Sequence, residues 1–106
     1  MKQVVIIYAT FPDAASAAMI GKVLVQEHLA ACINILPPIQ SIYEWEGRLE
    51  QTEEVAMIAK TIAGKEDALI ARIGALHPYA CPCIISWPIA AASEAFVEWV
   101  EKSTMQ

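Results

Sequence analysis

Residues 30–61, AACINILPPIQSIYEWEGRLEQTEEVAMIAKT, decide the fold of this chain. The pattern predicts two strands, Ala30–Trp45 and Leu49–Thr61, joined by a tight turn in which Gly47 adopts the positive φ that a short hairpin loop needs. The first strand would extend about 50 Å at ~3.3 Å per residue, whereas a domain of this length has a radius of gyration of only ~13 Å. The outer half of the hairpin therefore reaches beyond its own domain. Either a partner covers it, or it exposes an unpaired strand edge that is prone to associate with other chains.

Two prolines interrupt the first arm of the hairpin. Because Pro37 and Pro38 cannot donate to a strand ladder, a central, fully paired strand is excluded there, and a bulge or bend is predicted. In the second arm, residues 50–54 are mostly acidic and predict a solvent-exposed tip. Val55–Ala59 is apolar on both faces and predicts a central strand.

The rest of the chain alternates strands and helices. The expected elements are a strand buried on both faces at Val4–Thr10, a helix at Ala14–His28 capped by Asp13 or Ser16, a helix at Lys65–Leu76, a buried strand at Cys83–Trp87, and a short C-terminal helix capped by Ser93. Gly21 in the first helix indicates close backbone packing. The order βαββαβ plus a C-terminal helix is the split-βαβ, ferredoxin-like plan with a right-handed crossover. We expect one α+β domain over residues 1–106.

Composition excludes several classes of function. The apolar fraction is 57%, above the usual value of about 45–50%, and an interface between subunits is the natural place for the excess. The basic residues are scattered along a chain of net charge −5, which argues against a nucleic-acid partner. No apolar run approaches the ~18 residues of a membrane span. The apolar stretch near the N-terminus is too short for a signal peptide, so a cytoplasmic location is expected.

The segment His77–Cys83, HPYACPC, contains the densest group of reactive side chains. In an extended segment Cys81 and Cys83 point to the same side, about 7 Å apart, and thiolates with an imidazole suit copper(I) or zinc. One interpretation is a metal site formed by His77, Cys81 and Cys83, or completed by another subunit. The other is that both thiols only pack at the start of the strand, as free cysteines commonly do. Cys32, alone in an apolar strand, is expected in the core.

No recognisable catalytic motif is present, so the chain is not expected to be an enzyme. A catalytic alternative would use Cys32 or Cys81 as nucleophile and His77 as base. Carboxylates gather along the hairpin and either form a solvated tip or hold a hard divalent cation weakly; they are Glu44, Glu46, Glu50, Glu53 and Glu54. Aromatic side chains either line a small-molecule cleft or anchor packing and interfaces; they are Tyr43, Trp45, Tyr79 and Trp99.

Several motifs together resemble those of one family. They are Leu29–Ile35 (LAACINI), Ser41–Gly47 (SIYEWEG), Glu53, Lys60-Thr61 at the end of the second arm, His77-Pro78-Tyr79, Pro88-Ile89 and Trp99. With these motifs the chain resembles, over essentially its whole length, the CutA family of divalent-cation-tolerance proteins.

The resemblance implies a homotrimer of ferredoxin-like subunits whose long hairpins pair with neighbours, an architecture similar to that of the PII signalling trimers. It also implies tolerance to copper and other divalent metals, no established catalysis, and no metal required for folding. The cleft that it implies between subunits is lined by Cys32, Asn34, Ser41, Tyr43, Trp45, Glu53, Lys60, His77 and Tyr79.

The chain departs from the family pattern in the segment after the second helix. The usual segment is HPYExPE, and here Ala80 and Cys83 stand in place of the two glutamates. This change removes hard oxygen ligands, and Cys83 shifts any site there toward soft metals. Ala92 replaces a common glycine, and Phe96 replaces a usual tyrosine.

We therefore expect a trimeric, cytoplasmic protein of metal tolerance, with no nucleic-acid or membrane partner. Its cleft would bind copper, another divalent metal or a small ligand. The alternative is a small-molecule-sensing regulator similar to the PII proteins, in which metal has no direct role.

Overall fold

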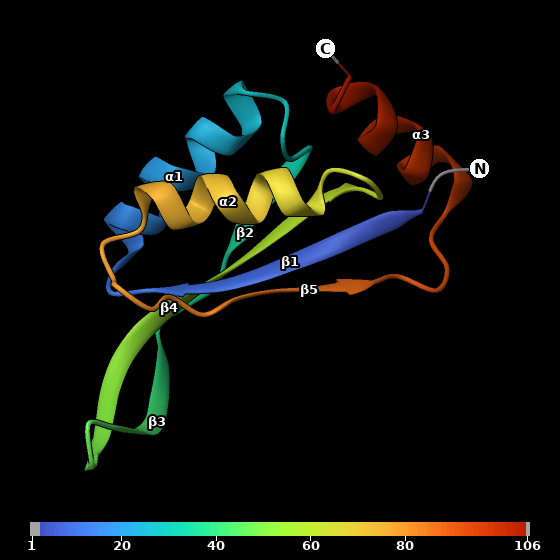
Figure 1. The fold of residues 1–106 in the computed structure, drawn as a ribbon. Coiled ribbons are helices and arrows are strands. Elements are labelled where there is room, and N and C mark those ends of the chain that lie inside the picture. Colours follow the sequence, from blue (N-terminus) through green and yellow to red (C-terminus); the bar gives the residue numbers. More distant parts are fainter. Residues whose placement is uncertain (1–2, 106) are drawn as a thin grey trace.

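The computed structural model describes residues 3–105, which form a sheet with helices on one face (Figure 1). The strands are β1 (Val4–Phe11), β2 (Cys32–Ile35), β3 (Ile39–Trp45), β4 (Arg48–Ile62) and β5 (Ile84–Pro88), and the helices are α1 (Ala14–Gln26), α2 (Glu66–Leu76) and α3 (Glu94–Ser103). This order confirms the prediction of an α+β, ferredoxin-like fold with a C-terminal helix. The predicted domain limits, 1 and 106, lie outside the described residues.

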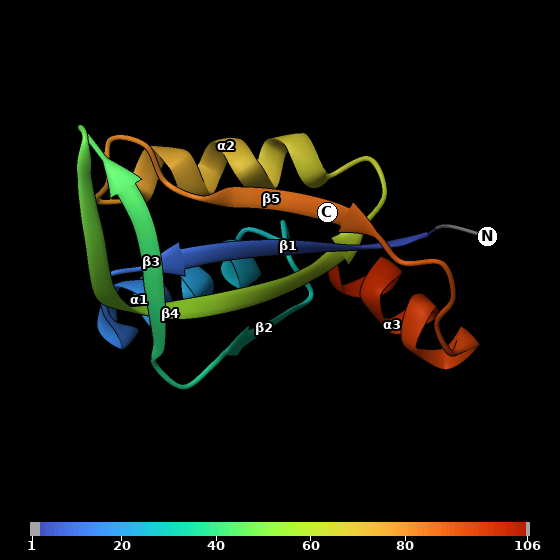
Figure 2. The ribbon, with the colours of Figure 1, turned by 90° about the horizontal axis from the view of Figure 1, so that it is seen from below.

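The sheet has the split-βαβ order. β4 lies between β2 and β1 and runs antiparallel to both, and β5 pairs antiparallel with the other side of β1. β1 and β2 are therefore parallel to each other, with β4 between them. Helices α1 and α2 cover one face of the sheet (Figure 1), and on the opposite face only the end near Val4 and Ile62 is covered by a helix, α3 (Figure 2). We call this opposite face the open face.

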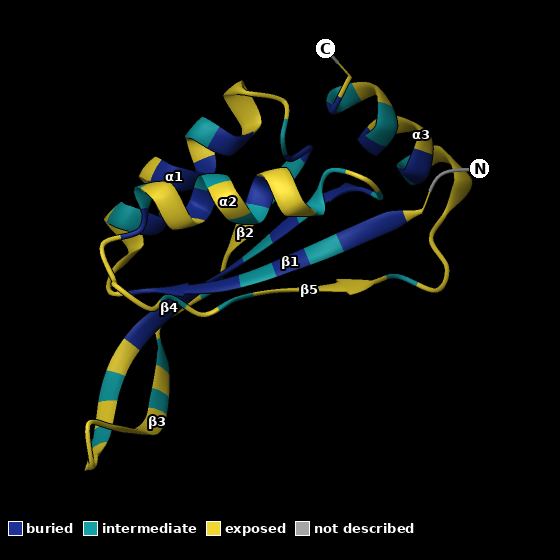
Figure 3. Ribbon diagram, in the orientation of Figure 1, coloured by how far each residue is buried: buried dark blue, intermediate teal, exposed yellow. Residues whose placement is uncertain are grey.

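The core lies between the sheet and helices α1 and α2 (Figure 3). Alternate side chains of a strand point to one face, and Ile7, Ala9 and Phe11 of β1 accordingly point toward these helices and are fully buried. The same cluster includes Ala17, Ile20, Leu24, Leu69 and Ile73 from the helices. A second cluster, which contains Val97 and Val100, attaches α3 to the end of the sheet.

Side-chain caps fix where α1 and α3 begin. Oδ1 of Asp13 accepts a hydrogen bond from the backbone N–H of Ser16 at 2.8 Å, and Oγ of Ser93 accepts one from the N–H of Phe96 at 3.4 Å. Both caps satisfy backbone N–H donors that a helix leaves unpaired in its first turn. Asp13 and Ser93 are both among the capping residues that the sequence predicted. None of the helices in residues 3–105 combines the length and the apolar character needed to cross a membrane.

Gly21 lets α1 approach β2 closely. A Cβ added at Gly21 would lie only 3.0 Å from Cγ2 of Ile33, which confirms the predicted close packing and explains a residue that costs a helix about 1 kcal/mol relative to alanine. The helix ends at Gln26, earlier than the predicted His28, because His28 adopts a left-handed conformation with φ 61°.

The long strand β4 leaves the sheet and pairs with two different strands, β2 in the sheet and β3 in the hairpin. Residues 36–38 separate β2 from β3, so the predicted continuous strand Ala30–Trp45 is wrong, whereas the break predicted at Pro37-Pro38 is confirmed. Gly47 has φ +79°, as the tight turn requires. The protruding hairpin gives the molecule a length of 46 Å, against 26 and 23 Å in the other two directions.

Strand β5 is an exposed edge of the sheet and not the buried strand that the sequence predicted. It pairs only with β1 among the described strands, and Ile85 and Trp87 are 48% and 40% exposed in the single chain. The prediction is wrong because, of the apolar side chains of β5, only Ile84 packs against the helix-covered core. Ile85 and Trp87 pair with Tyr8 and Ile6 on the open face.

A candidate ligand cleft beneath the hairpin

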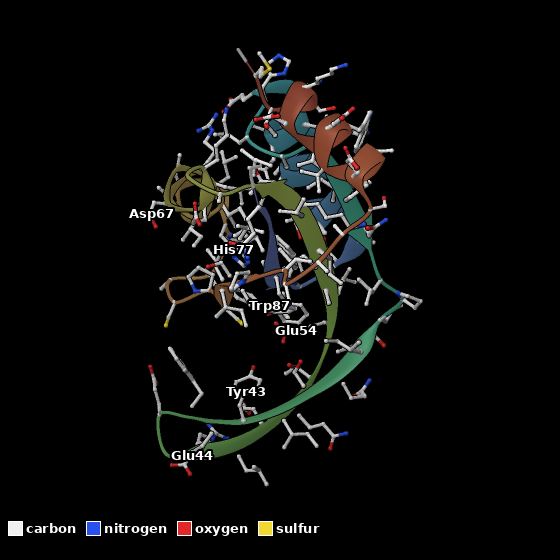
Figure 4. All side chains as sticks on the ribbon, turned by 90° about the vertical axis from the view of Figure 1, so that its right-hand side faces the viewer. Tyr43, Glu44, Glu54, Asp67, His77 and Trp87 are labelled. Carbon is white, nitrogen blue, oxygen red and sulfur yellow. The ribbon has the colours of Figure 1, made fainter. Side chains whose placement is uncertain are left out.

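A cleft of about 500 Å³ lies between the β3–β4 hairpin and the loop after α2. We call it the hairpin cleft, and it is lined by Thr10, Tyr43, Glu44, Trp45, Glu54, Tyr79, Ala80, Cys81 and Cys83. Figure 4 shows Tyr43 pointing from the hairpin toward the side on which Glu54 lies. No lysine, arginine or histidine is among the lining residues, so the ionisable groups of the cleft are carboxylates, phenols and thiols.

The register of the hairpin places side chains from both of its strands on the cleft side. Tyr43 pairs with Glu50, and paired residues of antiparallel strands share a face. Since alternate residues also share a face, Tyr43, Trp45 and Glu54 lie on one side of the hairpin. The hydroxyl of Tyr43 lies 3.4 Å from Oγ1 of Thr52 on the same side.

His77 is a buried support for the loop that forms the other wall. Pro78 disfavours a helical conformation at His77, which is extended (φ −71°, ψ 138°) and ends α2. The imidazole stacks on the ring of Phe11 at 4.7 Å, Nε2 donates to the carbonyl of Thr10 at 2.7 Å, and Nδ1 accepts from the N–H of Tyr79 at 3.1 Å. These two hydrogen bonds fix the neutral tautomer with its proton on Nε2.

Tyr79 connects this loop to β4. Its hydroxyl donates to Oε2 of Glu54 at 3.1 Å, and Glu54 is only 8% exposed. Burial, followed by the hydrogen bond to the Glu54 carboxylate, raises the pKa of Tyr79 from 10.0 to about 12. Both causes favour the protonated phenol, because a phenolate would lose hydration and would lie beside a negative charge.

The titration of Tyr79 provides a test of this wall. The raised pKa means that the folded state holds the phenolic proton more tightly than the unfolded state does. The resulting stabilisation is complete below pH 10 and is lost as the pH rises toward about 12. We expect the ultraviolet absorbance of phenolate to show one late-titrating tyrosine, which Tyr79→Phe abolishes. Three tyrosines that titrate together near pH 10 would contradict this arrangement.

The two cysteines after Tyr79 line the same cleft, but the predicted three-residue ligand set is not brought together. Cys81 and Cys83 are free and exposed. His77 already uses both ring nitrogens for hydrogen bonds to the backbone. Within residues 3–105, no group of three His, Cys, Asp or Glu side chains has metal-binding geometry. A site formed by His77, Cys81 and Cys83 within one subunit is therefore corrected to a pair of thiols at the hairpin cleft.

Part of the predicted intersubunit cleft is brought together in the single chain. Tyr43, Trp45 and Tyr79 all line the hairpin cleft. Ser41 lies on the Tyr43 side of the hairpin but does not line the cleft, and Glu53 lies on the opposite side.

The other predicted cleft residues form a separate group where β2 pairs with β4. The ammonium of Lys60 donates to Oδ1 of Asn34 and lies 3.9 Å from Sγ of Cys32. Cys32 is half-buried on an edge strand and not in the core, because β2 has no strand on its outer side among the described residues. Lys60 is six residues along β4 from Glu54, about 20 Å away at ~3.3 Å per residue. The single chain does not unite this group with the hairpin cleft.

Glu54 is the main residue of the cleft that sequence reasoning missed. We assigned it, with the other hairpin carboxylates, either to a solvated tip or to a weak site for a hard cation, whereas it is buried beneath Tyr79. Thr10, which also lines the cleft, carried no signal in the sequence, whereas Glu44 was named with the same group of carboxylates.

Sequence comparison identifies relatives over nearly the whole chain. Residues 5–103 match the family model described as CutA1 divalent ion tolerance protein. The divalent-cation tolerance protein CutA of Thermus thermophilus is 39% identical over 104 residues, which cover 98% of this chain and 99% of that protein. The chloroplastic protein CutA of Arabidopsis thaliana is 37% identical over 94% of this chain, which spans only 55% of that longer relative.

Structural comparison gives the same result. The crystal structure of the divalent ion tolerance protein CutA1 from Ehrlichia chaffeensis superposes with a TM-score of 0.95 at 34% identity. The alignment covers 100% of this chain and 99% of that one, so it includes both the hairpin and the loop that enclose the cleft. By sequence and by fold, the chain belongs to the CutA1 divalent ion tolerance family.

Proposed function

We propose that this protein takes part in tolerance to divalent metal ions, as a homotrimer that binds a metal in the hairpin cleft, with copper as the first candidate. Membership of the family supports the metal-tolerance role. The observation that carries the site is that Cys81 and Cys83 line the same cleft as Glu44 and Glu54, with no basic side chain among the lining residues. Thiolates select soft ions such as copper(I), and nearby carboxylates favour a cation electrostatically.

The proposed ligands are the two thiols of the loop after α2. Both are exposed, so an incoming ion can reach them without unfolding the loop. Since both ring nitrogens of His77 are hydrogen-bonded to the backbone of Thr10 and Tyr79, further ligands would come from a cleft carboxylate or from another subunit. Zinc would need such additional ligands, whereas copper(I) is satisfied by a small number of sulfur ligands.

Native mass spectrometry of the reduced protein tests this proposal. The protein would be measured alone and after addition of copper(I), copper(II) or zinc. A trimer that takes up one metal per subunit supports a site in each cleft, and one metal per trimer supports a site shared on the symmetry axis. A trimer without stoichiometric uptake would contradict direct binding and leave only an indirect role in metal tolerance.

The distribution of apolar surface supports the trimer. The accessible surface of the single chain is 6369 Å², whereas a compact monomer of this mass would expose about 5,800 Å². The open face carries apolar side chains that no helix covers, namely Ile6, Tyr8, Ile58, Ile85 and Trp87. On the hairpin, Tyr43 and Trp45 are 42% and 50% exposed. Contact with further copies of the chain would bury the open face and the part of the hairpin that lies outside the cleft.

Trp45→Ala is expected to weaken the trimer by at least about tenfold in its dissociation constant, because aromatic anchors dominate interfaces of this kind. A dilution series by sedimentation velocity measures the change. Met19→Ala is the control, since Met19 is also an exposed apolar side chain (57%) but lies on the outer side of α1. Equal trimer stability in the two variants would show that Trp45 is not an interface residue.

A small-molecule-sensing role is the second candidate, and the size of the cleft favours it. About 500 Å³ falls within the range of ~300–1,000 Å³ typical of small-molecule sites, and such sites are lined by aromatic groups with a few polar ones. Binding of a metabolite, with metal affinity no higher than background, would favour this role over the first.

We propose no catalytic role. The thiol-enzyme alternative needs His77 as a base, but both nitrogens of its ring already bond to the backbone. Slow alkylation of all three cysteines would count against it further. The cytoplasmic location also stays a prediction, because the relatives include a chloroplastic protein of Arabidopsis thaliana and one from Archaeoglobus fulgidus described as periplasmic.

A further inference from the structure

We propose that the hairpin cleft binds a small organic ammonium ion, held by the Glu54 carboxylate and surrounded by aromatic rings. The proposal rests on the small-molecule role named above as the second candidate, and it specifies the chemical class of the ligand. It depends on Glu54 and the aromatic rings of the cleft, whereas the metal site proposed above depends on the thiols of Cys81 and Cys83, with a cleft carboxylate only as an additional ligand.

Glu54 supplies a fixed negative charge with one oxygen open to the cleft. Its Oε2 accepts the hydrogen bond from Tyr79, whereas within residues 3–105 no hydrogen bond to Oε1 is formed. No buried side-chain oxygen of the described chain lacks a hydrogen-bond partner, so Oε1 is not fully buried. Glu54 as a whole is only 8% exposed and lines the cleft, so the cleft is where Oε1 meets solvent. An N–H donor or a cationic group of a ligand can approach this oxygen there.

Three aromatic rings border the same space from two sides. Tyr43 and Trp45 come from the hairpin and Tyr79 comes from the loop after α2. These three residues are between 38% and 50% exposed in the single chain, so the ring surface on the cleft side is open to a ligand there. Aromatic faces attract ammonium groups within ~6 Å of the ring, and several rings around one space are the known means of holding a quaternary ammonium.

The charge of the lining selects for cations. Glu54 is the carboxylate on the cleft side. Glu44 also lines the cleft, but it alternates with Tyr43 and Trp45 along β3 and therefore lies on the opposite face of the hairpin. No basic side chain of the lining neutralises Glu54. The net charge of the chain, −5, has the same sign. Among the lining residues an anionic metabolite would therefore meet only like charge, although Arg48 pairs with Trp45 on the same face of the hairpin, and a neutral metabolite would gain nothing from the charge of Glu54. A cation with an apolar body uses both the Glu54 carboxylate and the aromatic walls, and it also fills a space much larger than a single metal ion.

Isothermal titration calorimetry with choline tests the proposal. The probe would be compared with its neutral isostere, the alcohol in which a carbon atom replaces the ammonium nitrogen of choline. The protein would be full-length, reduced and metal-free. We expect choline to bind at least about tenfold more tightly than the alcohol, which has the same shape without the charge. Equal affinity for the two compounds, or no binding of choline, would overturn the proposal.

Glu54→Gln removes the charge and keeps the size of the side chain. It should weaken choline binding by at least about tenfold and leave the affinity for the alcohol unchanged. Glu98→Gln removes the same charge from an exposed position on α3 and is the control. An equal loss in both variants would assign the effect to net charge alone and overturn the proposal. If Glu54→Gln does not fold, Tyr43→Leu serves instead, since loss of an exposed ring should weaken choline more than the alcohol.

Metal uptake measured on the same wild-type preparation separates this proposal from the metal-binding function. Copper(I) uptake without preference for choline over the alcohol would overturn the ammonium site and leave the metal site intact. Preference for choline without metal uptake would support the ammonium site and contradict the metal site.

Discussion

Replacing Phe11 by alanine is expected to lower the free energy of unfolding by about 3–5 kcal/mol. Phe11 is fully buried at the end of β1, and its ring stacks on His77 with the centroids 4.7 Å apart. The strand cannot easily move inward to fill the resulting cavity, because Phe11 is itself paired with Val55 of β4. The loss therefore combines the transfer of an aromatic ring to water with an unfilled cavity.

Denaturant unfolding followed by circular dichroism measures this loss. Wild type and variant must be compared at one protein concentration, because dissociation of an oligomer makes the apparent stability depend on concentration. Phe96→Ala is the matched control, since Phe96 is a half-buried ring on α3 and should cost less than half as much. A loss below ~1 kcal/mol at Phe11 would contradict the packing described here.

The same substitution should also affect the hairpin cleft. The ring of Phe11 supports the imidazole of His77, which in turn fixes the backbone of Tyr79 and so positions the phenol against Glu54. A looser His77 would reduce ligand affinity even in the fraction of molecules that remains folded. Phe11 is a positioning residue in this sense, since it does not line the cleft itself.

Local signals were sufficient to predict most of the fold. Asp13 and Ser93 are side chains that satisfy helix donors, Gly47 tolerates a positive φ, and Pro37-Pro38 cannot pair, so each dictates its own backbone geometry. Local signals of this kind could not show that β5 is exposed in the single chain and not buried in its core. Its apolar residues fit either the core of the same chain or the surface of another chain, and periodicity cannot distinguish these environments.

The candidate site was predicted in part for a similar reason. Tyr43, Trp45 and Tyr79 were proposed to line a cleft, and the fold brings them together. The sequence could not reveal that both ring nitrogens of His77 form hydrogen bonds to the backbone, because one partner, the carbonyl of Thr10, is 67 positions away along the chain. It could not separate Glu54 from the other acidic residues of the hairpin either, because its burial depends on the distant loop that carries Tyr79.

Replacing both Cys81 and Cys83 by serine is expected to reduce copper(I) affinity by more than about a hundredfold. Loss of a group that only orients a metal ligand already costs ~10–100-fold, so loss of the ligands themselves must cost more. Serine keeps the size of each side chain and replaces soft sulfur by hard oxygen, which copper(I) binds poorly. Competition with a chromophoric copper(I) chelator, under anaerobic reducing conditions, measures the affinity.

Cys32→Ser is the matched control for this substitution. Cys32 is the one cysteine of the chain that does not line the hairpin cleft. It lies beside Lys60, which is about 20 Å along β4 from Glu54 at ~3.3 Å per residue. If the thiols of the hairpin cleft bind the ion, Cys32→Ser keeps the affinity of the wild type and the double variant loses it. If Cys32→Ser loses the affinity instead, the ion binds at the β2–β4 edge, where a neighbouring subunit would have to supply further ligands. If all variants retain it, thiols are not the ligands, and the carboxylates of the cleft become the groups to replace next.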